Sequence, residues 1–107
     1  AVLVEGATDS GEKLYISHIV LCELTWVLGR AYKLQKPDLL TALSSILRTA
    51  EIEVEAADLA NRALRRFLAG HADFADYLIA ERAAEAGCTG LATFDARLRE
   101  EGGCFAP

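Results

Sequence analysis

Short runs of β-forming residues alternate with helical stretches along most of this chain, and this alternation restricts the possible fold more than any other feature. Strands are expected at residues 14–16, 52–54, 90–93 and 104–106. Helices are expected over residues 18–32, from 37 onward, over 58–68 and 73–86, and briefly over 95–99. Strands that alternate with helices pair in parallel, with helices on both faces of the sheet. The sequence therefore predicts a three-layer α/β/α fold, and 107 residues suffice for a single domain.

The composition is that of a globular protein, with 52% hydrophobic and 25% charged residues. No apolar run reaches membrane-spanning length, because Glu23 interrupts the longest candidate, so no membrane contact is expected. A net charge of −5 argues against nucleic-acid binding across the whole surface. Arg62, Arg65 and Arg66 lie close together on one predicted helix. They form either a local basic strip or a solvated outer face, and the solvated face is the favoured interpretation.

The cysteines indicate a reducing compartment. Cys22, Cys88 and Cys104 are odd in number and form no CxxC pair, which is typical of reduced, mostly buried thiols in a cytoplasmic protein. A Cys88–Cys104 disulfide is the alternative. No signal peptide is recognisable. The sequence contains no methionine, so residue 1 is not expected to be the natural translation start.

Four acids carry the main functional signal. Asp73 and Asp76 open the helix over residues 73–86, and their spacing places both carboxylates on one face. Asp95 follows a short apolar run and is expected just past the end of a strand. Each has a plain structural explanation, since aspartates are preferred at helix starts. Glu23 lies in the middle of the apolar helix over residues 18–32 and is expected to point into apolar surroundings, where a carboxylate is costly unless a cation or a buried partner accompanies it.

The four acids taken together are more informative than any one of them. In a parallel sheet, Asp76 at a helix N-terminus and Asp95 at a strand C-terminus lie on the same rim. Carboxylates crowded on a rim repel each other unless they share a proton or a cation. An all-oxygen cluster selects a hard ion, Mg²⁺ or Mn²⁺. Such an ion binds phosphate oxygens and activates water for attack on phosphorus. We therefore expect Glu23, Asp76 and Asp95 to converge on one ion.

Three segments resemble the PIN-domain ribonucleases, and among these the VapC toxins of bacterial and archaeal toxin–antitoxin pairs. They are Tyr-Ile-Ser-His-Ile-Val-Leu-Cys-Glu-Leu-Thr-Trp-Val-Leu at 15–28, Ala-Asp-Phe-Ala-Asp-Tyr-Leu-Ile-Ala at 72–80, and Thr-Phe-Asp at 93–95. The resemblance covers the chain from Leu14 onward. It implies metal-dependent cleavage of RNA by a group of acids, with a cognate antitoxin protein and a symmetric homodimer as further partners.

The resemblance also implies roles for individual residues. Glu23 matches the helix glutamate of the family, Asp76 the aspartate of its second motif, and Asp95 the acid of its third. Asp73 matches an additional acid that accompanies the second motif in some members. Thr93 matches a hydroxyl beside the metal.

One family motif has no counterpart here. PIN domains open with a strand that ends in Asp-Thr-Asn or a similar sequence, and that aspartate is a main metal ligand. Residues 1–5 are better interpreted as the tail of the first helix, and Asp9, in a polar loop, does not replace the strand acid. We therefore expect a single PIN-like domain over residues 1–107 that lacks its first strand, about 20 residues at ordinary element lengths. Its neighbouring strands are then expected to pair with each other or to accept a strand from another chain, in a strand-swapped oligomer. In both cases the site lacks one acid, so metal affinity and nuclease activity are expected to be weak or absent.

Two other functions compete with the nuclease. A non-catalytic PIN-like module would bind an antitoxin or self-associate, and a buried Glu23 without a metal or basic partner would favour it. A receiver-type phosphoacceptor also uses acids on the rim of a sheet. That class needs a lysine at a late strand end, whereas the last lysine here is Lys36, so this alternative is disfavoured.

Overall fold

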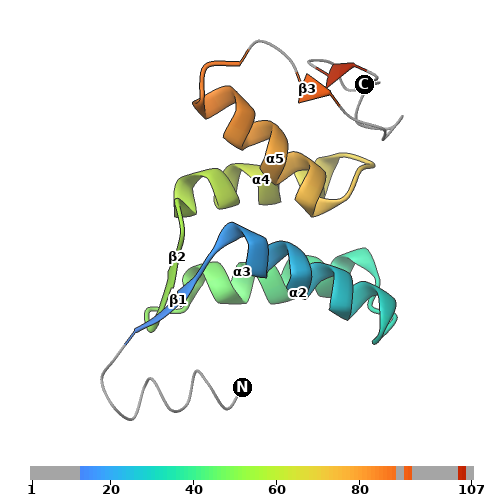
Figure 1. Ribbon diagram of the computed structural model, residues 1–107. Helices are drawn as coiled ribbons and strands as arrows, with labels where there is room; N and C mark the ends of the chain where they lie inside the picture. The colour runs from blue at the N-terminus through green and yellow to red at the C-terminus, as the bar shows by residue number, and fades with distance from the viewer. Residues whose placement is uncertain (1–12, 89–90, 93–103, 106–107) are drawn as a thin grey trace.

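A computed structural model describes residues 13–88, 91–92 and 104–105. Its elements in chain order are β1 (Leu14–Ile16), α2 (His18–Arg30), α3 (Lys36–Arg48), β2 (Ile52–Val54), α4 (Ala57–Ala69), α5 (Phe74–Glu85), β3 (Leu91–Ala92) and β4 (Cys104–Phe105). In Figure 1, α4 and α5 form one layer above α2 and α3, with β1 and β2 along one side. The short helix expected over residues 95–99 lies outside the described residues.

Local sequence signals account for where the helices begin and end. Ser17 caps α2, where its Oγ accepts a hydrogen bond from the backbone N–H of Val20 at 3.2 Å. Pro37 lies in the first turn of α3, where no intrahelical N–H bond is lost. Gly87 follows α5 with a φ of 86°, the left-handed conformation in which many helices end. The predicted elements in this part of the chain are therefore confirmed, with shifts of one or two residues at their ends.

The strands pair in parallel, as predicted. Leu14 lies opposite Ile52 in the β1–β2 pair, and Leu91 lies opposite Cys104 in the β3–β4 pair. Among the described residues these are two separate two-stranded sheets, and in Figure 1 β3 lies above α5, away from β1 and β2. Direct pairing of β1 with β3, one of the two expected outcomes, is therefore not formed by the described residues.

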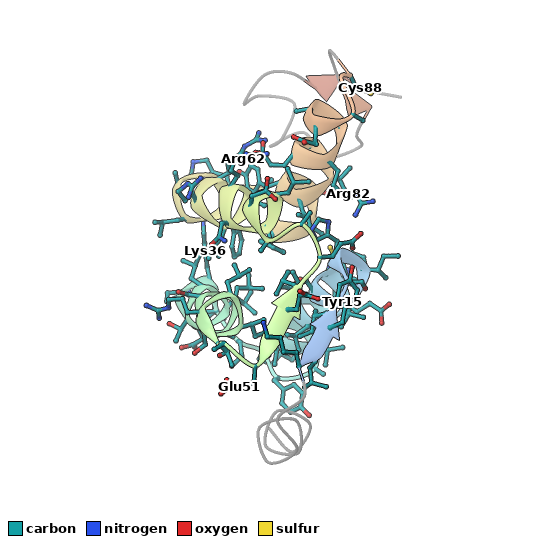
Figure 2. All side chains as sticks on the ribbon, turned by 90° about the vertical axis from the view of Figure 1, so that its left-hand side faces the viewer. Tyr15, Lys36, Glu51, Arg62, Arg82 and Cys88 are labelled. Carbon is teal, nitrogen blue, oxygen red and sulfur yellow. The ribbon has the colours of Figure 1, made fainter. Side chains whose placement is uncertain are left out.

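The hydrophobic core lies between the two helical layers. Its largest fully buried side chains come from α2, α3 and α5, and they are Leu21, Leu43, Phe74, Tyr77 and Leu78. Burial of each such side chain contributes about 1.5–3 kcal/mol. Lys36 at the start of α3 ties the layers together: its Nζ donates to the Gly70 carbonyl at 2.7 Å and lies 5.0 Å from the centre of the Phe67 ring (Figure 2).

The apolar helix α2 is buried on one side only. Leu21 and Thr25 are buried, but Ile19, Val20, Trp26 and Val27 are 46–69% exposed. The reason is that α2 packs against α3 and α5 through one side only, while the short β1–β2 sheet leaves the opposite side open to solvent. Hydrophobic periodicity identifies a helix face, but it does not show whether another element covers that face.

Other burial predictions need smaller corrections. Leu68 follows the buried Phe67 on α4 but is itself 66% exposed, because the buried face of this helix is formed by Leu59, Ala60, Ala63 and Phe67. Cys22 is half-buried, as expected, whereas Cys88 is exposed beyond the end of α5. Within the described part of the chain, no helix has the length and apolar character needed to cross a membrane.

Candidate active site between α2 and α5

The two aspartates of the second motif form the beginning of α5. Asp73 is the N-cap residue, and Asp76 Oδ2 accepts a hydrogen bond from the Asp73 backbone N–H at 3.2 Å, in a capping box. Negative charge at this position also interacts favourably with the helix dipole. The structural explanation of this pair is therefore confirmed. It does not exclude a second role, because a carboxylate accepts several bonds at once.

Glu23 lies on α2, at a hollow of about 320 Å³ between α2 and α5, which we call the larger hollow. Cys22 and Trp26 of α2 line it, together with Ile79 and Arg82 of α5. The Glu23 side chain is exposed, contrary to the prediction that it points into apolar surroundings. An exposed carboxylate keeps its contact with water, so the burial argument for a cation at Glu23 does not hold.

Asp76 lies on the side of α5 that faces α2. Burial raises the pKa of the Cys22 thiol, the Arg82 guanidinium lowers it, and the Asp76 carboxylate raises it further. Asp76 is thus close enough for its charge to act on Cys22, the residue next to Glu23. The structure therefore brings Glu23 and Asp76 to the same region between α2 and α5.

A second hollow of about 140 Å³, the smaller hollow, lies nearer the start of α5. Asp73 and Phe74 line it from α5, and Thr25, Trp26 and Arg30 line it from α2. Trp26 borders both hollows. Sequence reasoning did not select Trp26 or Arg30, although helical spacing alone places them on the Glu23 face of α2.

The donor atoms suit a hard divalent cation, because Glu23, Asp73 and Asp76 supply carboxylate oxygens and no soft ligand is required. The remaining predicted residues, Thr93 and Asp95, lie outside the described residues. Within the described ranges, no group of three or more His, Cys, Asp or Glu side chains is arranged to hold a metal ion. The carboxylate oxygens thus fit the ion that the family resemblance implies. The convergence of Glu23, Asp76 and Asp95 on one ion stays a prediction.

His18, Glu55 and Arg82 also line the larger hollow, and they form a polar cluster that the sequence did not predict. His18 is 3% exposed, and its backbone N–H donates to Glu55 Oε1 at 2.8 Å. Arg82 Nη1 lies 2.8 Å from His18 Nδ1. A guanidinium only donates, so Nδ1 is the acceptor and Nε2 carries the proton, which points to the Ala56 carbonyl at 3.4 Å. Glu55 and Arg82 are 37 and 64 positions from His18 in the sequence, so no local pattern reveals the cluster.

The basic residues of α4 are mostly neutralised. Arg62 Nε lies 2.9 Å from Glu81 Oε1, and Arg66 Nη1 lies 3.3 Å from Glu81 Oε2. The Arg66 guanidinium also stacks 5.0 Å above the Tyr77 ring. Only Arg65 of the three is exposed without an acidic partner in the described part of the chain. This arrangement joins α4 to α5 and does not form a basic strip.

Comparison with known proteins defines the class to which this fold and these acids belong. The family model for the PIN domain matches residues 2–102, and the chain belongs to the PIN-domain family. Over 98 residues it is 26% identical to a protein described as a VapC ribonuclease, from Aquifex aeolicus (strain VF5). That alignment covers 92% of this chain and 73% of the relative. No solved structure gives a significant match.

Proposed function

We propose that this chain is a metal-dependent endoribonuclease of the VapC type, acting in the cytoplasm as the toxin of a toxin–antitoxin pair. Three findings support the proposal: the PIN-domain match, the likeness to a VapC ribonuclease, and the position of Glu23 and Asp76 in one region between α2 and α5. The PIN-domain match carries the argument, because it spans residues 2–102, and the acids supply the oxygen ligands that a divalent ion takes in a phosphodiesterase site.

In this proposal Glu23, Asp73, Asp76 and Asp95 hold Mg²⁺ or Mn²⁺, with the Thr93 hydroxyl beside it. When bound, the ion supplies a Lewis acid that activates water and stabilises charge on the phosphate. The residues of the chain orient the substrate around it. Asp76 is suited to holding the ion, because its capping bond with the Asp73 backbone N–H fixes the position of its carboxylate at the start of α5.

The alternative is a non-catalytic module of the same fold that binds an antitoxin or a second copy. The observation in its favour is the open side of α2, where Ile19, Val20 and Val27 are exposed. Exposed apolar groups of this kind mark binding surfaces. The nuclease proposal includes the same partners, an antitoxin and a homodimer or strand-swapped oligomer, so activity is what separates the two.

The test is cleavage of a labelled single-stranded RNA by the 107-residue chain in Mg²⁺ or Mn²⁺, with a chelator as the blank. We expect weak cleavage that occurs only with metal, and a further loss of at least about 100-fold in Asp76→Asn, the scale of removing one charge-stabilising group from an active site. Asp58→Asn is the matched control, because Asp58 also lies in the first turn of a helix but on α4. It should retain the wild-type rate. Equal cleavage by Asp76→Asn would contradict the assigned role.

A further inference from the structure

Trp26 occupies a position that the metal-binding acids do not explain. It is the sole tryptophan of the sequence, it is 46% exposed, and it borders both the larger and the smaller hollow. A residue shared by two adjacent hollows stands between them. Trp26 also lies one helical turn from Glu23, on the same face of α2.

An exposed indole at this place is not accounted for by packing. The core side of α2 is formed by Leu21 and Thr25, and Trp26 projects from a different side. Partly exposed aromatic rings beside a reactive centre are the platforms on which proteins stack the unpaired bases of single-stranded nucleic acids. Stacking of this kind accepts any base, because every base has a π-face.

Arg30 supplies the complementary charge. It lies one turn beyond Trp26 on α2, is exposed, and lines the smaller hollow. Within the described part of the chain, Arg30 has no carboxylate partner, whereas Arg62, Arg66 and Arg82 each have one. A guanidinium without an internal partner remains available for a phosphate oxygen, which it contacts through two parallel N–H bonds.

We propose that Trp26 stacks on a nucleobase of single-stranded RNA, and that Arg30 binds a phosphate of the same strand. The two residues are positioning residues: they place the strand along α2 so that a phosphodiester reaches Glu23 and Asp76. The inference rests on the proposed ribonuclease function and adds the substrate-binding surface to it. The binding is single-stranded, because a paired base offers no free face to the indole.

Intrinsic fluorescence tests the stacking without a variant, because Trp26 is the only tryptophan. A mixed-sequence, single-stranded RNA of about ten nucleotides is titrated in Ca²⁺, a hard cation that takes the same oxygen ligands. A gel verifies that the RNA remains intact. We expect saturable quenching of Trp26. A ribose-phosphate oligomer of the same length without bases should leave the fluorescence unchanged.

Variants then separate the two contacts, with affinity measured by the polarisation of labelled RNA. Trp26→Leu should weaken binding about 5-fold or more, and Trp26→Phe should recover part of the loss because it keeps an aromatic face. Arg30→Gln should weaken binding of the intact and the base-free oligomer alike. Arg65→Gln, which removes an exposed arginine from α4, is the matched control and should bind as the wild type does.

The inference is overturned if RNA leaves Trp26 fluorescence unchanged, if the base-free oligomer quenches it equally, or if Trp26→Leu binds as well as the wild type. A fluorescence change that follows protein concentration without RNA overturns it as well, because a second copy would then cover the indole. Cleavage in Mg²⁺ is assayed separately. A chain that cleaves RNA but shows none of these signals therefore refutes the role of Trp26 and leaves the proposed function standing.

Discussion

At the scale of single residues, Asp76 combines a structural role with its proposed catalytic one. Its Oδ2 accepts the Asp73 N–H, and its charge lies at the N-terminus of α5. We therefore expect Asp76→Asn to lower the free energy of unfolding by about 0.3–1 kcal/mol, the usual value of a charge at a helix end. Urea unfolding at neutral pH measures the difference.

Glu23→Gln is the matched control for that measurement. It also removes one carboxylate charge from the candidate site, but Glu23 is exposed in the middle of α2 and caps nothing. Its effect on stability should stay within about 0.5 kcal/mol. A loss in Asp76→Asn no larger than that in Glu23→Gln would show that the Asp76 charge at the start of α5 does not stabilise the protein.

The thiols of Cys22 and Cys88 differ in how far they are buried. Burial raises the pKa of Cys22, so little of it is thiolate at neutral pH, whereas Cys88 is exposed. Cys88 should react with iodoacetamide faster than Cys22 by about 10-fold or more, since the raised pKa of Cys22 and its half-buried position both slow the reaction of that thiol. Mass spectrometry of the peptides that contain each cysteine measures the two rates. Equal rates would mean that α2 and α5 open readily at the larger hollow.

At the scale of elements, Glu55 connects β2 to α2 and α5. The hydrogen bond from the His18 backbone N–H lowers the pKa of Glu55, and Arg82, 3.8 Å from Oε2, acts in the same direction. A carboxyl with a lowered pKa stabilises the folded state above its ordinary pKa of about 4.3, and that contribution is lost as the pH falls through the lower, folded value. We expect Glu55→Gln to be less stable than the wild type at pH 7 and to lose less stability below pH 4.

Glu53→Gln provides the control for this acid sensitivity. Glu53 lies on the same strand, β2, but is exposed. Urea midpoints at pH 7, 5 and 3 should shift in Glu53→Gln in parallel with the wild type. If Glu55→Gln also follows the wild type at every pH, the link between the start of α2 and the end of β2 contributes nothing to stability.

The elements also show how far sequence reasoning reaches. Ser17, Pro37 and Asp73 act on backbone groups within a turn of their own positions, so the helix starts could be predicted. Parallel pairing follows from the order of strands and helices. The exposure of Glu23 could not be predicted, because it depends on which distant element covers α2. The His18–Glu55 bond joins residues 37 apart, and no local pattern encodes such a contact.

At the scale of the whole molecule, β1 has one edge that the described residues leave open. Leu14 N–H donates to Glu51 at 2.8 Å, and the Ile16 carbonyl accepts from Glu55 N–H at 2.9 Å, so these residues direct their backbone groups toward β2. Backbone groups alternate sides along a strand, so those of Tyr15 point to the other edge. Tyr15 is also 61% exposed, with Ile19 and Val20 exposed at the adjacent start of α2. An apolar open edge of this kind is a template for another strand.

We therefore predict that the chain self-associates by strand addition at β1, in a homodimer or a strand-exchanged oligomer. Tyr15→Pro should prevent this association: it removes the N–H at the open edge, and proline is tolerated where that N–H makes no bond to the neighbouring strand. Tyr15→Val is the matched control, because it keeps the N–H and the β preference while removing the ring. Light scattering over a concentration series should show association in the wild type and Tyr15→Val but not in Tyr15→Pro. Amide exchange should show protection of the residue-15 N–H in the wild type and Tyr15→Val, the two chains that keep this group. A wild-type chain that stays monomeric at all concentrations, or a Tyr15→Pro chain that associates equally, would place the interface elsewhere.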